Sequence, residues 1–135
     1  MLASCDAGLL IGDPALFVDH RALAAEKIDM GQAWTDLTGL PFVWAFWAGR
    51  PGALTAAEVA ALQEARNAGV DESEAIARDY FPGLPDRARV GAKYLRDNIR
   101  HHLGPDERAG LELFYRYAAE AGAVNSPAPL DFFGQ

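Results

Sequence analysis

The chain has 135 residues, half of them apolar and 23% charged, and its net charge is −7. This length allows one ordinary core, while the acidity excludes the Lys- and Arg-rich surfaces that bind nucleic acids or anionic membranes. The single cysteine, Cys5, excludes an internal disulfide and argues against a Cys/His metal site. No signal peptide and no stretch of about 20 apolar residues is seen, so a cytoplasmic protein is expected.

The first predicted element is a short strand. Residues 8–12 form a wholly apolar run that ends in Gly-Asp-Pro, which is typical of a buried strand followed by a turn or a helix start. Residues 17–27 predict a loop or a short helix. Asp29 then predicts the start of a helix that runs from Met30 to a stop at Gly39, with Gln32 as the return arm of a capping box.

A second buried strand is predicted next. Residues 41–48 read Pro-Phe-Val-Trp-Ala-Phe-Trp-Ala and lie between Gly-Leu-Pro and Gly-Arg-Pro-Gly. Thr55 and Glu58 then form a clear capping box for a helix that we expect to end at Gly69. A similar pair, Asp71 and Glu74, predicts a helix that ends near residue 80 or 81, before a proline.

Two longer helices follow. Apolar residues at helical spacing predict one from about Ala88 to Leu103. Pro105 predicts the start of the other, which Gly122 ends. Two strands cannot form a sheet that buries helices on both faces. The sequence therefore predicts part of an α/β protein whose remaining strands lie outside it.

Two sequence runs resemble those of a known family. Residues 6–16 read Asp-Ala-Gly-Leu-Leu-Ile-Gly-Asp-Pro-Ala-Leu, and residues 30–47 contain Met-Gly-Gln-Ala-Trp, Leu-Thr-Gly-Leu-Pro-Phe-Val and then Ala45 and Trp47. The later helices match at Tyr94, Leu95, Ile99, Leu103, Gly110, Leu111 and Phe114. In these features the chain resembles the carboxy-terminal half of the chorismate dehydratases of the futalosine route to menaquinone, from about Leu2 to Val124.

The resemblance implies a type II periplasmic-binding-protein-like fold with two α/β lobes, present here as a partial, helix-rich carboxy-terminal portion. Residues 1–20 would end the second lobe and begin the return crossing. Residues 21–124 would complete the first lobe with its closing helices, and residues 125–135 would be a loose tail. The family's enzymes are about twice as long, so the chain alone is expected to be incomplete and inactive.

The function that the resemblance implies is that of a lyase. Chorismate would lose water to give 3-[(1-carboxyvinyl)oxy]benzoate, without a metal or an organic cofactor. The partner is thus a small anionic substrate. The catalytic base and the groups that bind its carboxylates are expected largely in the other half, so no catalytic residue is predicted here and no oligomeric state follows.

Two residues are predicted to contact the substrate. Asp13 would lie at the carboxyl end of the first strand, where ligands of α/β sheets bind. It would contact a hydroxyl group or a water, because a carboxylate repels an anionic substrate. Gly12 would permit close approach of the backbone. The competing roles are an N-cap for Asp13 and an ordinary turn glycine for Gly12.

Other polar and aromatic residues favour structural roles. Thr38 ends a helix, where anions are not attracted. Trp47 could stack on an aromatic ring but more often packs in a core, and Arg50 could steer an anion but more often solvates a loop. His101 and His102 match no catalytic pattern, and Cys5 reads as a small core residue.

Two other functions stay open. One is the sister enzyme of the same route, 1,4-dihydroxy-6-naphthoate synthase, which shares the fold, although the run from Leu40 to Trp47 looks more like the dehydratase. The other is a non-catalytic solute-binding module, against which the lack of a secretion signal argues.

Overall fold

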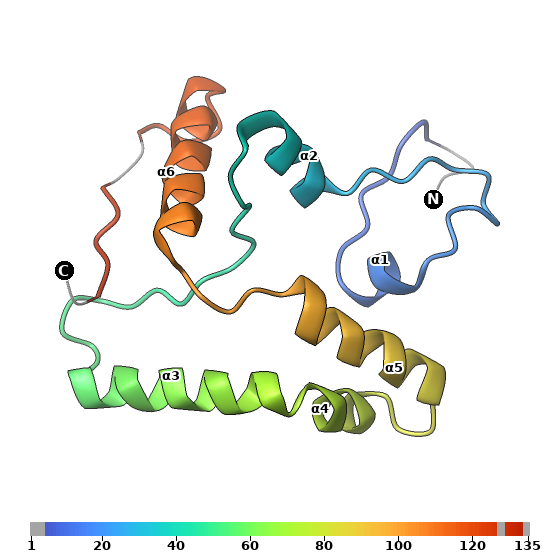
Figure 1. Cartoon of the computed structure of the whole chain (residues 1–135). Helices are drawn as coiled ribbons and strands as arrows, with labels where there is room; N and C mark the ends of the chain where they lie inside the picture. Colours follow the sequence, from blue (N-terminus) through green and yellow to red (C-terminus); the bar gives the residue numbers. More distant parts are fainter. Residues whose placement is uncertain (1–4, 127–128, 134–135) are drawn as a thin grey trace.

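The computed structural model describes residues 5–126 and 129–133, and within them all regular structure is helical. The helices are α1 (Asp13–Phe17), α2 (Met30–Thr38), α3 (Ala56–Asp71), α4 (Ser73–Tyr80), α5 (Pro85–Lys93), a π-helical turn η1 (Tyr94–Asn98) and α6 (Pro105–Glu120). Figure 1 shows α3, α4 and α5 along one side of the molecule and α2 and α6 on the other. No helix in the described part of the chain could cross a membrane.

Two of the three predicted helix caps are confirmed. The Asp29 carboxylate accepts hydrogen bonds from the backbone N–H groups of Gly31 and Gln32, and Thr55 and Glu58 close a complete capping box. The predicted box at Asp29 is wrong, because the Gln32 amide donates to Asp36 instead of reaching back.

The predicted helix ends were partly wrong. The stop at Gly39 is confirmed, with Gly39 in the left-handed region at φ 72°. By contrast, α3 passes through Gly69 and ends at Asp71. The predicted end of α4 near residue 80 is confirmed, but the predicted cap by Asp71 and Glu74 is wrong, because Glu72 precedes α4 and makes no side-chain cap. Gly69 keeps a helical backbone because glycine permits a left-handed stop without requiring one.

The helix predicted from 88 to 103 is displaced and shorter. It begins at Pro85 and ends in η1, where the Ile99 N–H donates to the Tyr94 carbonyl five residues back. The following helix begins at Pro105, as predicted, and Gly122 follows its end at φ 72°.

Both predicted strands are wrong for the described chain. Residues 8–11 and 41–49 have no regular secondary structure, and most of their side chains are exposed. No hydrogen bond to their backbone is formed among the described residues. A strand is defined by pairing with a neighbour, and no described segment lies in place to pair with either run.

The small core lies between α4 and α5. Phe81, at the end of α4, packs over Gly91, where a methyl group would come within 2.9 Å of the Phe81 ring. The other buried apolar side chains here are Ala77, Ala88 and Ala92. Small residues let the two helices approach closely, so this pair is the best-packed part of the chain.

A second cluster joins α2, the segment after it and α6. The ring centroid of Trp34 lies 5.7 Å from that of Phe42 and 5.9 Å from that of Phe114, in edge-to-face geometry. Gly110 of α6 lies directly against the Pro41 carbonyl. These contacts hold the three segments together. The residues that make them all belong to the parts of the sequence that resemble the family.

The carboxy-terminal segment makes one notable contact. The Arg108 guanidinium of α6 lies 4.2 Å from the centre of the Phe132 ring. Figure 1 shows the chain running back along α6 from its far end. Residues 1–4, 127–128 and 134–135, which belong to the predicted end of a lobe and to the predicted tail, lie outside the described residues.

Candidate functional site

The turn predicted to contact the substrate contains a glycine in a backbone conformation that other residues rarely adopt. Gly12 has φ 70° and ψ −147° and is the N-cap of α1. Its carbonyl accepts from the N–H groups of Ala15 and Leu16 at 2.9 and 3.1 Å. Because an L side chain would strain this backbone, the turn requires glycine at this position.

Asp13 is therefore not an N-cap. It is the first residue of α1, its side chain is exposed, and its carboxylate makes no hydrogen bond or ion pair among the described residues. This contradicts the capping role considered for Asp13 and leaves its two oxygens available as acceptors.

Aromatic contacts fix α1 on the α4–α5 pair. The Phe17 ring packs edge to face on Phe81 with centroids 5.3 Å apart. The Arg87 guanidinium covers Phe17 from 4.9 Å. These contacts anchor the carboxyl end of the helix that begins at Asp13, so the position of the carboxylate depends on the core of the molecule.

A hollow of about 290 Å³ lies beside the second apolar segment. Trp47 borders it and is 87% exposed. The other bordering residues come from α3, α4, η1 and the segment that follows: Arg66, Gly69, Val70, Ser73, Ile76, Leu95 and His101. The indole of Trp47, the guanidinium of Arg66 and the imidazole of His101 are groups that could bind a planar anion. However, the Arg66 guanidinium already donates a hydrogen bond to the Asn67 amide oxygen at 2.8 Å.

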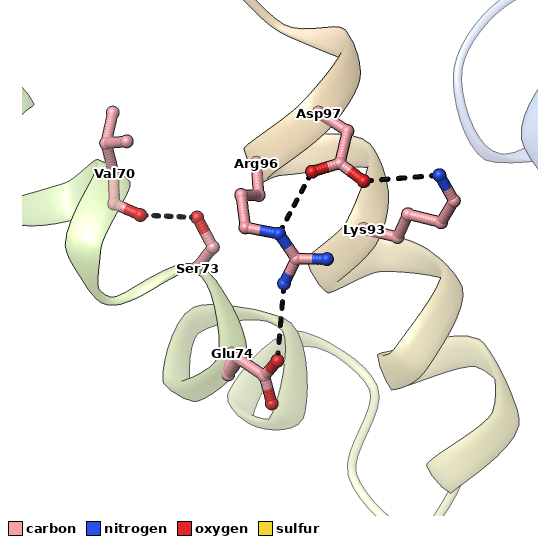
Figure 2. Close-up of polar contacts among 6 residues, drawn as sticks. All are labelled: Val70, Ser73, Glu74, Lys93, Arg96 and Asp97. Carbon is pink, nitrogen blue, oxygen red and sulfur yellow. Dashed lines mark hydrogen bonds and ion pairs between the residues drawn. The ribbon is translucent and has the colours of Figure 1, made fainter.

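A larger groove of about 500 Å³ runs beside α4 and α5. Its charged residues are Glu74, Arg78, Arg89, Lys93 and Arg96. Figure 2 shows Arg96 bridging Glu74, at 3.4 Å, and Asp97, at 2.9 Å, with Lys93 on the other oxygen of Asp97. The hydrogen bonds from Lys93 and Arg96 hold the pKa of Asp97 below its ordinary value of 3.8.

These pairs neutralise most of the groove's positive charge. Arg89 pairs with Asp86 in the same way. Arg78 alone among the groove's cations has no carboxylate partner in the described chain. Exposed pairs of this kind contribute little to stability and leave little charge to bind an anion, so the groove is a weak candidate.

The remaining candidates lie apart from one another. The Thr38 hydroxyl donates to the Trp34 carbonyl at 2.8 Å and accepts from the Leu40 N–H, so it stabilises the end of α2 as expected. Arg50 and His102 are exposed. Cys5 is also exposed, which contradicts its prediction as a core residue.

The structure brings Trp47 and His101 to one hollow and leaves Asp13 at a separate turn. Sequence reasoning missed Arg66, because a lone arginine within a helix carries no local signal. Within the described residues, no three His, Cys, Asp or Glu side chains are grouped to hold a metal ion.

Comparison with known proteins finds a matching family model and similar proteins. A family model described as menaquinone biosynthesis matches residues 1–120. The chain is similar to a chorismate dehydratase of Thermus thermophilus, with 32% identity over 134 residues, covering 84% of this chain and 48% of that protein. The chain thus spans about half the length of this relative. No solved structure matches it.

Proposed function

The chain belongs to the menaquinone biosynthesis family, and we propose that it forms part of a chorismate dehydratase. The observation that carries the proposal is the 32% identity to the Thermus chorismate dehydratase over 84% of this chain. The contacts of Trp34 with Phe42 and of Gly110 with the Pro41 carbonyl support it, because they join the parts of the sequence that resemble the family.

The proposed reaction is the dehydration of chorismate to 3-[(1-carboxyvinyl)oxy]benzoate. A ring proton and a hydroxyl group leave together as water, and the gain of aromaticity drives the step. The enzyme must therefore mainly position the substrate and provide a modest base or acid. No cofactor is required by this chemistry.

Asp13 is proposed to contact the leaving hydroxyl or a water beside it. Its exposed carboxylate, which has no hydrogen-bond partner in the described chain, can accept such a hydrogen bond. Gly12, whose backbone conformation would strain any other residue, brings the turn close to a ligand. The substrate's own carboxylates would avoid Asp13 and bind elsewhere.

The rest of the machinery is proposed to come from the half of the relative that this chain does not match. We propose that the two parts together form a two-lobed α/β enzyme of the periplasmic-binding-protein-like type, with the substrate between the lobes. The catalytic base and the groups that bind the carboxylates would then belong mainly to the other part.

The proposal can be tested with a hybrid enzyme, in which this chain replaces the matched region of the Thermus protein. Two bacterial strains are used, one without chorismate dehydratase and one without 1,4-dihydroxy-6-naphthoate synthase. The hybrid should restore growth without added menaquinone to the first strain only. Rescue of only the second strain would assign the sister reaction, and rescue of neither by a folded hybrid would refute the proposal.

A further inference from the structure

The chain exposes far more surface than a finished domain of its mass. Its accessible surface is 10792 Å² at 14.6 kDa, whereas a folded monomer of this mass exposes about 6,900 Å². The excess of about 3,900 Å² is several times the area of about 800 Å² that each partner contributes to an ordinary protein interface. The uncovered surface is therefore large enough for a partner of considerable size.

Large apolar side chains are exposed in three stretches of the sequence. These include Leu9 and Ile11, Met30 and Leu37, and Trp44 and Trp47, with exposed fractions between 56% and 87%. Monomeric proteins seldom leave such side chains in contiguous runs in water. All six side chains lie within the two runs that resemble the family, residues 6–16 and 30–47.

The backbone of two of these stretches has no partner in the described chain. Among the described residues, no hydrogen bond reaches the main chain of residues 8–11 or 42–49. The second run contains no charged residue and is fixed at its start, where Phe42 packs against Trp34 and Phe114. An anchored, uncharged, unpaired run is a ready template for strand addition.

The third stretch is an uncovered helix face. Met30, Ala33 and Leu37 share one side of α2, at positions i, i+3 and i+7, and all are exposed. Next to this face is Trp34, whose indole nitrogen is buried without a hydrogen-bond partner in the described chain. Buried donors normally find a partner, so both features point to a missing neighbour on this side.

We propose that one strand-bearing polypeptide docks on these three stretches. The occupant is the equivalent of the half of the Thermus dehydratase that this chain does not match, whether it is joined to this chain or separate. Its strands pair with residues 8–11 and 42–49, and it also covers the apolar face of α2. The proposal rests on the proposed function.

A second copy of this chain fits the observations less well. An ordinary dimer would cover about 800 Å² of each copy and leave most of the excess exposed. It would also bring no further strands, because the described residues of each copy contain none. The large excess and the unpaired backbone together favour a partner of similar size that contains a sheet.

Hydrogen exchange of the backbone amides tests this interface. Amides 43–49 should exchange without protection in the chain alone and become protected in the hybrid enzyme. Trp47→Asp should reduce this protection. Phe133→Asp, at a side chain that is 60% exposed outside the three stretches, should leave it unchanged.

Several outcomes would overturn the proposal. If amides 43–49 are protected in the chain alone and sedimentation shows a monomer, the chain covers these residues itself. If sedimentation shows a dimer, a second copy of the chain is the occupant. Unprotected amides in a folded hybrid would also contradict it. If the hybrid does not fold, the two parts can be co-expressed as separate chains and captured by a tag on this one, where absence of the Thermus part refutes the interface. Protection without conversion of chorismate would keep the interface and refute only the proposed function.

Discussion

Gly110 in α6 lies so close to the carbonyl oxygen of Pro41 that no side chain fits between them. This contact sets the distance between α6 and the segment that follows α2, and it places Phe114 against Phe42 one turn further along, with ring centroids 5.2 Å apart. This contact explains the glycine at position 110, because any side chain there would overlap the Pro41 carbonyl.

Gly110→Ala should therefore destabilise the chain. A methyl group would overlap the Pro41 carbonyl and force the helix and the segment apart, at a cost of about 1–3 kcal/mol. Gly69→Ala is the matched control, because Gly69 lies within α3 with nothing within 4 Å of the added methyl group. It should stabilise the chain by about 0.5–1 kcal/mol. Urea unfolding measures the free energy of unfolding of both variants. If both substitutions changed it in the same direction, the structure would be contradicted.

Asp29→Ala should weaken the start of α2. The variant loses the carboxylate that accepts from the N–H groups of Gly31 and Gln32, and we expect a loss of about 1 kcal/mol in the free energy of unfolding. Asp29→Asn should retain most of the stability, because asparagine caps helices about as well. The cap would be unimportant if both variants melted at the temperature of the original chain.

The cap of α3 should make stability depend on pH. Hydrogen bonds from the Thr55 backbone and hydroxyl lower the pKa of Glu58 below its ordinary value of 4.5. A lowered pKa in the folded state contributes stability above the ordinary value, and this contribution disappears as the pH falls through the folded-state pKa. Glu58→Gln should thus be less stable at neutral pH, and the difference should shrink below pH 4.5.

The control for this pH dependence is Glu64→Gln on the same helix. The Glu64 carboxylate is exposed and makes no hydrogen bond among the described residues, so the variant should unfold like the original chain at every pH. Urea unfolding at a series of pH values checks both variants. A Glu58→Gln difference that grew as the pH fell would show that the sign is wrong.

Asp13→Asn should lower turnover of chorismate by the hybrid enzyme without lowering its stability. A hydrogen bond to a charged group contributes about 1.5–3 kcal/mol, so kcat/KM should fall about 10- to 100-fold. The melting temperature should not change, because the side chain is exposed and has no partner in the described chain. Asp79→Asn, at an exposed carboxylate on α4, is the control and should keep full activity. If both variants were equally active, Asp13 would have no role in binding the substrate.

Local chemistry explains why some helix starts were predictable. Asp29 and Thr55 bind backbone groups two or three residues away, and such contacts can be recognised in the sequence. The stop expected at Gly69 failed because a glycine allows a helix to continue. No glycine or proline stands next to the end of η1 at Asn98, so no local pattern predicts this end.

The predicted strands failed for a different reason. The apolar runs 8–12 and 41–48 were correctly recognised as uncharged, but strand formation needs a neighbouring strand. The turn at Gly12 and Asp13 could be located from its Gly-Asp-Pro sequence. The hollow beside Trp47 could not, because it brings together Arg66 and His101, which are 35 positions apart in the chain.

We propose that this chain provides part of an enzyme that dehydrates chorismate. The most direct test is to incubate the purified hybrid with chorismate and identify the product by mass spectrometry, with the Thermus enzyme in parallel. We predict a product that has lost one water and is 3-[(1-carboxyvinyl)oxy]benzoate. Unchanged chorismate with a folded hybrid, while the Thermus enzyme converts its substrate, would contradict the claim.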